Sequence, residues 1–152
     1  MPKIVLTDKP DGAAIQHLVR GLTDFNVQQG GPRNAATLAI LVSDEDSGEV
    51  LGGLLGGTAY GYLKIEILYL PESLRGTGLG TRLMQQAEEE AVRRGCRAAW
   101  LETFTFQAQG FYERLGYSVF GEIEDYPAGH SMLFLKKTLA PVPAASPAPA
   151  AS

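Results

Sequence analysis

The segment Arg75-Gly76-Thr77-Gly78-Leu79-Gly80 constrains the fold of this chain more than any other. It lies between an apolar, strand-like run (residues 63–70) and a long helical pattern that begins near Leu79. Glycines at such a junction carry no Cβ atom, so a ligand can approach the backbone closely. The first amides of a helix have no intrahelical partner and lie at the positive end of its dipole. Together with the permanent charge of Arg75, they predict a seat for a phosphate-bearing ligand.

The composition is typical of one globular domain with a hydrophobic core. The 152 residues are 45% apolar and 20% charged, and no apolar stretch approaches the roughly 20 residues that span a bilayer. The N-terminus lacks the apolar segment of a signal peptide, so we expect a cytoplasmic protein without a membrane partner. The formal charge of −4 argues against a nucleic-acid partner, which usually needs a basic stripe, and is compatible with a cationic substrate.

Cysteine usage bears on metal and redox chemistry. Cys96 is the single cysteine, which excludes an internal disulfide framework and a multi-cysteine zinc site. No metal is therefore predicted. Because no histidine neighbours Cys96, we favour structural burial over a nucleophilic role.

The hydrophobic pattern predicts the element order β-α-β-β-β-α-β-α-β-β. The predicted strands cover residues 3–6, 37–42, 49–60, 62–70, 97–103, 117–122 and 131–137. The predicted helices run from an Asp11 N-cap to about Leu22, from 79 to 94 and from 107 to 115, and residues 23–34 are predicted as a loop. Four glycines in 49–60 predict bulges or close packing.

These elements define the fold class. Short turns between successive strands favour antiparallel pairing, and the strand–helix–strand unit 63–103 favours a right-handed parallel crossover. We therefore expect an α/β (α+β) fold with a mixed, largely antiparallel central sheet flanked by helices. Residues 1–139 are predicted to form a single domain, and the Ala/Pro-rich residues 140–152 a disordered tail outside it.

Two other phosphate-binding folds compete for the glycine turn. A Rossmann fold has the fingerprint Gly-x-Gly-x-x-Gly, whereas this chain has Gly-x-Gly-x-Gly preceded by Arg75, and antiparallel strands seldom precede such a fold. A P-loop is excluded because no Gly-Lys-Ser/Thr closes the turn.

Two segments resemble the GCN5-related N-acetyltransferase (GNAT) family. Arg75, Gly78 and Gly80 fill the acetyl-coenzyme A signature Gln/Arg-x-x-Gly-x-Gly/Ala of that family. Residues 107–117, with the pair Phe111-Tyr112 and a closing Leu-Gly-Tyr, resemble its later helix. The resemblance covers roughly residues 3–139, although residues 10–60 match only in layout. Residues 125–130 resemble a bacterial subgroup of small members of unassigned substrate.

The resemblance implies acetyl-CoA as cosubstrate and a fold whose parallel strand pair splays at its C-terminal ends. The pantetheine arm would lie in this gap and the pyrophosphate on the glycine turn. The implied cofactor-binding residues are Leu68, Tyr69, Leu70, Arg75, Gly76, Thr77, Gly78, Leu79, Gly80, Thr81, Gln107 and Phe111.

The implied reaction is direct transfer of the acetyl group to a primary amine. Such transfer needs a neutral amine, a donor for the oxyanion and a proton for the departing thiolate. A backbone amide near Leu70 is the implied oxyanion donor, and Tyr112 the implied acid, unless it is only a core tyrosine. Glu66 and Glu102 are the candidate bases, but either could be a solvated edge residue or an ion-pair partner. We expect His130 to shape the acceptor site or to cap a turn.

The acceptor is predicted to be a small-molecule amine. A protein lysine or N-terminus, or a non-catalytic CoA-binding sensor or interaction module, remain the alternatives. Tyr60, Tyr62, Phe104 and Phe106 could line the acceptor pocket, although strand aromatics more often belong to a core. The resemblance also suggests a homodimer.

Overall fold

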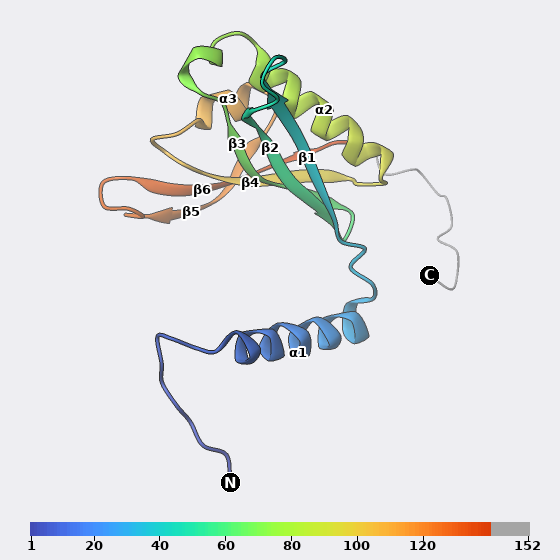
Figure 1. Cartoon of the computed structure of the whole chain (residues 1–152), viewed down its shortest axis with the longest axis vertical. Helices are drawn as coiled ribbons and strands as arrows, with labels where there is room; N and C mark the ends of the chain where they lie inside the picture. Colours follow the sequence, from blue (N-terminus) through green and yellow to red (C-terminus); the bar gives the residue numbers. More distant parts are fainter. Residues whose placement is uncertain (141–152) are drawn as a thin grey trace. The chain divides into compact units, whose positions relative to one another are not determined.

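The computed structural model describes residues 1–140 (Figure 1). The predicted tail lies outside the described residues, apart from Ala140. The chain divides into two compact units, Met1–Arg33 and Asn34–Ser152, which are described separately.

The first unit is built on helix α1 (Gly12–Gly30). Asp11 occupies the N-cap position as predicted, although its side chain makes no capping hydrogen bond. The helix continues past Leu22 to Gly30, so the prediction of a loop from residue 23 was wrong. Phe25 continues the helical spacing of Ile15, Leu18 and Leu22, which outweighs the polar residues in between. The predicted strand at 3–6 is not formed, because no strand among the described residues pairs with it.

The second unit contains a six-stranded sheet in the order β1-β2-β3-β4-β6-β5. Its strands are β1 (Ala36–Ser43), β2 (Val50–Ala59), β3 (Tyr62–Tyr69), β4 (Ala98–Phe104), β5 (Ser118–Glu124) and β6 (Ser131–Thr138). Neighbouring strands are antiparallel except for β3 and β4, which are parallel. This mixed sheet confirms the predicted fold class and excludes the doubly wound parallel sheet of a Rossmann fold.

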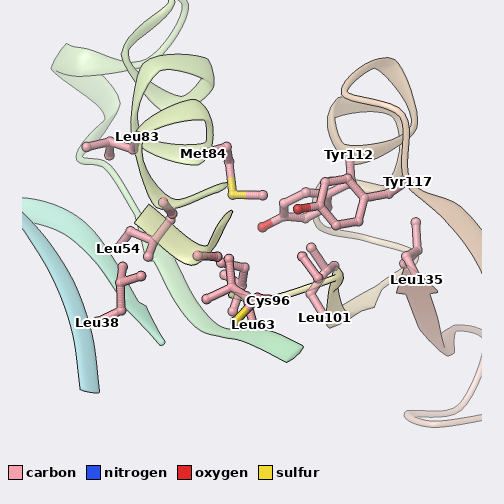
Figure 2. Close-up of a cluster of buried hydrophobic side chains, with 14 of the residues drawn as sticks. Leu38, Leu54, Leu63, Leu83, Met84, Cys96, Leu101, Tyr112, Tyr117 and Leu135 are labelled. Carbon is pink, nitrogen blue, oxygen red and sulfur yellow. The ribbon is translucent and has the colours of Figure 1, made fainter. Parts of the chain in front are cut away.

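One face of the sheet carries the hydrophobic core. Helix α2 (Leu79–Arg93) buries Leu83, Met84, Ala87 and Ala91 at helical spacing. Figure 2 shows Leu83 and Met84 above the sheet residues Leu63 and Leu101, with Tyr112 and Tyr117 beside Met84. The short helices η1 (Glu72–Leu74) and α3 (Gln109–Arg114) complete this unit.

Cys96 belongs to this core. Its residue surface is 4% exposed, which confirms the prediction of structural burial. Burial also raises the pKa of its thiol, because the thiolate would lose hydration.

A β-bulge in β3 lies at Glu66, one of the two candidate bases. Leu55 of β2 pairs with Ile67, whereas the next residue, Gly56, pairs with Ile65, so Glu66 is the extra residue. A Cβ atom on Gly56 would collide with the Lys64 carbonyl oxygen, which explains a glycine here. The bulge reverses the alternation of β3, so that Leu68 packs against the core while Ile67 is exposed.

Candidate functional site

The parallel strands β3 and β4 separate in mid-sheet. Their pairing runs from Tyr62↔Ala98 to Ile65↔Leu101 and ends there. Beyond this point β4 continues to pair with β6, and β3 with β2. A cavity of about 630 Å³ occupies the gap and is lined by both strands, including Leu68 and Thr103. The splayed strand pair is therefore confirmed.

The glycine turn leads directly into α2. Gly76 and Gly78 have φ of 75° and 82°, which an L-residue rarely adopts. The Arg82 amide donates to the Gly78 carbonyl oxygen at 3.1 Å. By helix geometry, the amides of the three preceding residues, Leu79, Gly80 and Thr81, have no intrahelical acceptor. The turn thus has the form that binds an anion.

The side chain of Arg75 is held by the backbone at the end of β3, before the glycine turn. Its Nε donates to the Leu70 carbonyl oxygen at 2.9 Å, which leaves both terminal nitrogens of the guanidinium for a ligand. Thr77 Oγ1 donates to the Leu74 carbonyl oxygen at 2.8 Å and stabilises the turn. A second cavity, of about 520 Å³, extends over Arg75, Gly76, Gly78, Gly80 and Thr81.

Gly80 connects the two motif segments. A Cβ atom at this position would lie 3.3 Å from Cζ of Phe111 in α3, closer than side chains normally pack. The third glycine of the turn therefore allows α2 to approach Phe111, which lines the same cavity. The role of this glycine is at least partly in helix packing.

Arg114 is a lining residue that the sequence reasoning missed. It lines the 520 Å³ cavity together with Phe111 and Arg75. Its signal was present in the sequence, because residues 111 and 114 are three apart in a predicted helix and share one face.

Gln107 holds the connection between β4 and α3. Its Oε1 accepts hydrogen bonds from the Phe104 amide at 2.9 Å and from Thr103 Oγ1 at 3.2 Å. The side-chain NH₂ remains as a donor, and the residue lines the 630 Å³ cavity.

Tyr112 combines burial with access to the cavity. The residue is 8% exposed, its ring meets Tyr117 edge-on at 6.1 Å, and it lines the 630 Å³ cavity. Its hydroxyl makes no hydrogen bond to the described residues and is not enclosed. Burial raises the pKa of this phenol, so it stays protonated at neutral pH. Tyr112 is therefore a core residue that also lines the cavity.

Glu66 and Glu102 lie on either side of one lysine. Lys64 Nζ is 3.7 Å from Glu66 Oε2 and 3.4 Å from Glu102 Oε1, and it also lies 4.5 Å from the ring centroid of Trp100. Glu66 and Glu102 are thus both ion-pair partners of Lys64, one of the alternatives that the sequence left open. Both carboxylates also line the 630 Å³ cavity and an adjoining cavity of about 190 Å³.

Phe106 lines the 630 Å³ cavity and Phe104 the 190 Å³ cavity, and their rings stack with centroids 5.0 Å apart. Phe104 also stacks on Tyr126 at 6.0 Å, and Phe106 meets His130 edge-on at 5.0 Å. By contrast, Tyr60 precedes β3 and Tyr62 begins it, and neither lines these cavities. Both are exposed, so neither the possible place in the pocket nor the favoured place in the core is found for them.

Two further properties concern residues 1–140. No group of three or more His, Cys, Asp or Glu side chains among them is arranged to hold a metal ion. None of their helices has the length and apolar character to cross a membrane.

Known proteins share this sequence pattern and fold. Residues 15–117 match the model of the acetyltransferase (GNAT) family. The chain is 35% identical over 133 residues to the acetyltransferase Atu2258 of Agrobacterium fabrum, covering 88% of this chain and 96% of that protein. It is 41% identical over 95 residues to the blasticidin-S acetyltransferase of Streptomyces morookaense, covering 62% of this chain and 70% of that enzyme.

Solved structures of acetyltransferases also share the fold of this chain. A crystal structure of an Agrobacterium tumefaciens protein assigned as an acetyltransferase has a TM-score of 0.85 and 34% identity, covering 90% of this chain and 99% of that one. An aminoglycoside 6'-N-acetyltransferase complexed with coenzyme A shares the fold, with a TM-score of 0.61 and 24% identity over 70% of this chain and 75% of that one. The splayed strands, the glycine turn and these relatives show together that this chain belongs to the GNAT family of acetyltransferases.

Proposed function

We propose that this protein is an N-acetyltransferase that moves the acetyl group of acetyl-CoA directly to a primary amine of a small molecule. One observation carries this proposal. The 520 Å³ cavity over the glycine turn and the 630 Å³ cavity of Tyr112, Glu66 and Glu102 share Leu68, Leu70, Arg75 and Ala108 as lining residues. A ligand anchored at the turn can therefore reach the two carboxylates and the phenol.

The anchor is electrostatic. The free amides at the start of α2 and the guanidinium groups of Arg75 and Arg114 would bind the pyrophosphate of the coenzyme. The pantetheine arm would then follow the exposed backbone of Leu68 to Leu70 and contact Phe111 and Gln107. Gly76, Thr77 and Gly78, the other cofactor-binding residues that the resemblance implies, would shape the turn that carries these amides.

The chemical steps fall to residues of the gap. Glu66 or Glu102 takes a proton from the amine, whose nitrogen forms a bond to the acetyl carbon. A backbone amide near Leu70 stabilises the oxyanion. As the carbon–sulfur bond breaks, Tyr112 gives its proton to the thiolate and later recovers one from solvent.

A small-molecule acceptor is supported by the relatives. Blasticidin S and aminoglycosides are small molecules, named as substrates of an enzyme 41% identical to this chain over 95 residues and of a structural neighbour. A protein lysine or N-terminus is the alternative acceptor, and a CoA-binding sensor or interaction module is the alternative without turnover. The proposal includes a homodimer, which sedimentation velocity would test. It also includes a cytoplasmic location.

The test is release of free thiol from acetyl-CoA in the presence of an amine panel. The panel contains polyamines, aminoglycosides, nucleoside amines and lysine peptides, and mass spectrometry identifies the product. We expect acetylation of at least one small amine. Turnover of peptides alone would transfer the activity to proteins, and CoA binding without turnover of any amine would favour the sensor.

A further inference from the structure

We propose that the acceptor amine is attached to a flat, π-bearing ring, and that Phe104, Phe106, Tyr126 and His130, here named the aromatic ledge, hold that ring. The inference rests on the proposed function and narrows its acceptor to a chemical class. It concerns residues that neither the glycine turn nor the transfer step uses.

The aromatic ledge is an ordered stack. The rings of Phe104 and Phe106 are nearly parallel, at 9°, and those of Phe104 and Tyr126 at 22°. His130 stands at 74° to Phe106 and supports its edge. The Tyr126 amide donates to the His130 carbonyl oxygen at 3.0 Å, and the His130 amide to the Pro127 carbonyl oxygen at 2.9 Å, so the loop is braced. Such a surface is preorganised for a further ring.

The ledge is not part of the core. Phe106 is 55% and Tyr126 51% exposed, whereas the core aromatics Tyr112 and Tyr117 are 8% and 3% exposed. Large aromatic side chains normally bury their surface, and clustered exposure next to a cavity marks a binding site. A ligand ring stacked on the ledge would bury the aromatic surface of Phe106 and Tyr126 that is exposed in the folded protein.

Two residues of the ledge line the cavities of the gap, and Tyr126 and His130 adjoin them through Phe104 and Phe106. Phe106 lines the 630 Å³ cavity together with Tyr112 and Glu102, and Phe104 lines the adjoining cavity together with Glu66 and Glu102. A ring on the ledge thus places a short amine arm between the carboxylates and the thioester. A saturated polyamine would use the carboxylates but leave the ledge uncovered.

Charge in the gap favours a cation. Glu66 and Glu102 share the ammonium of Lys64, which leaves one net negative charge among the three groups. Arg75 lines the same cavity, but in the proposed complex its charge is neutralised by the pyrophosphate of the coenzyme. An acceptor that arrives as an ammonium ion is attracted before it loses its proton. A ring that itself carries positive charge would gain further from the faces of Phe106 and Tyr126.

The test uses two amines that differ only in the ring. Benzylamine and cyclohexylmethylamine have the same charge and similar size, but only benzylamine has a π face. Calorimetry with the protein saturated by CoA gives their dissociation constants. We expect benzylamine to bind roughly fivefold to tenfold more tightly, because aromatic stacking adds to apolar burial. The ratio of kcat/KM values should follow.

Variants then assign the preference to the ledge. Phe106→Leu should bring the ratio of the two constants close to one. Phe120→Leu is the matched control, because Phe120 is 52% exposed but lies on β5, lines neither cavity and packs against Phe134 rather than against a ring of the ledge. Tyr126→Leu, at a second exposed ring of the ledge, repeats the test if Phe106→Leu fails to fold.

The outcomes separate this inference from the proposed function. Equal binding of both amines would overturn the inference that the ledge holds a ring, even if both amines are acetylated. A binding ratio that Phe106→Leu and Tyr126→Leu leave unchanged would overturn it as well. A ratio that depends on the ledge but no turnover of any amine would support the ring site and overturn the acetyl transfer.

Discussion

Tyr112 illustrates how one side chain serves packing and chemistry together. Its ring makes edge-on contacts with Phe111 and Tyr117 at 5.1 Å and 6.1 Å, and the residue lines the 630 Å³ cavity. Packing restricts the ring to one orientation, and burial raises the pKa of the phenol. Both effects suit an acid that must hold its proton until a thiolate forms.

Tyr112→Phe should lower kcat while leaving CoA affinity nearly unchanged. The substitution keeps the ring and removes only the proton donor, and loss of general acid catalysis typically costs about 100-fold or more. Steady-state kinetics and CoA calorimetry measure the two quantities. Phe111→Leu is the matched comparison, which should weaken CoA binding instead. An unchanged kcat would remove Tyr112 from the mechanism.

Glu66 and Glu102 make separate predictions. If one of them is the base, its Gln variant should lose about 100-fold in kcat and should also lose the rise of rate with pH that a general base produces. The other variant should keep that rise, since it loses only an ion pair with Lys64. Rate profiles against pH for both variants decide the assignment. If both Gln variants keep the pH profile of the wild type, neither carboxylate is the base.

At the scale of elements, three segments meet at one carboxylate. Glu88 of α2 accepts a hydrogen bond from Tyr117 Oη at 2.8 Å and pairs with Lys137 Nζ of β6 at 2.7 Å. Tyr117 follows α3, so this contact ties α2, α3 and the sheet together behind Tyr112. The glycine turn, which precedes α2, and Tyr112, the proposed acid in α3, are thereby held in a fixed relation.

Lys137→Met should destabilise the protein because it leaves Glu88 partly buried without its cation. The loss should be about 2 kcal/mol, typical of an uncompensated, partly buried charge. Combining it with Glu88→Gln should recover part of this loss, since the carboxylate is then neutral. Urea unfolding measures each variant.

Lys136→Met is the control for this series. It changes an exposed neighbour on the same strand and should stay within about 0.5 kcal/mol of the wild type. A Lys137→Met variant as stable as the wild type would contradict the coupling.

For the whole molecule, the buried phenols predict weaker stability in alkali. Burial, and for Tyr117 also the Glu88 carboxylate, raises the pKa of Tyr112 and Tyr117 above the ordinary 10.0. The unfolded chain therefore releases these protons at lower pH than the folded chain. Their contribution is intact below pH 10.0 and is lost progressively as the pH rises above it.

Urea unfolding between pH 8 and pH 11 measures this effect. Tyr117→Phe should flatten the fall of unfolding free energy with pH, and Tyr60→Phe, at an exposed tyrosine, is the control. An identical slope in Tyr117→Phe and the wild type would refute the assignment.

Local patterns were sufficient for much of the fold. The spacing of Leu83, Ala87 and Ala91 predicted α2, and turn residues separated the strands, because both signals act over a few neighbours. The glycine turn and the Phe111-Tyr112 pair likewise identified the family from short segments. Element ends were less accurate, and α1 extends to Gly30 because its apolar spacing outlasts the polar residues that suggested a loop.

Contacts between distant segments were decided by the tertiary structure. The bulge at Glu66 depends on the register between β2 and β3, and the pairing of Lys64 with Glu102 depends on where β3 and β4 part. The aromatic ledge needs residues from β4 and from the β5–β6 loop to meet. The sequence by itself determined the glycine turn and the family, because both are encoded in adjacent residues. Register and strand separation, which no single segment encodes, decided what surrounds the acceptor.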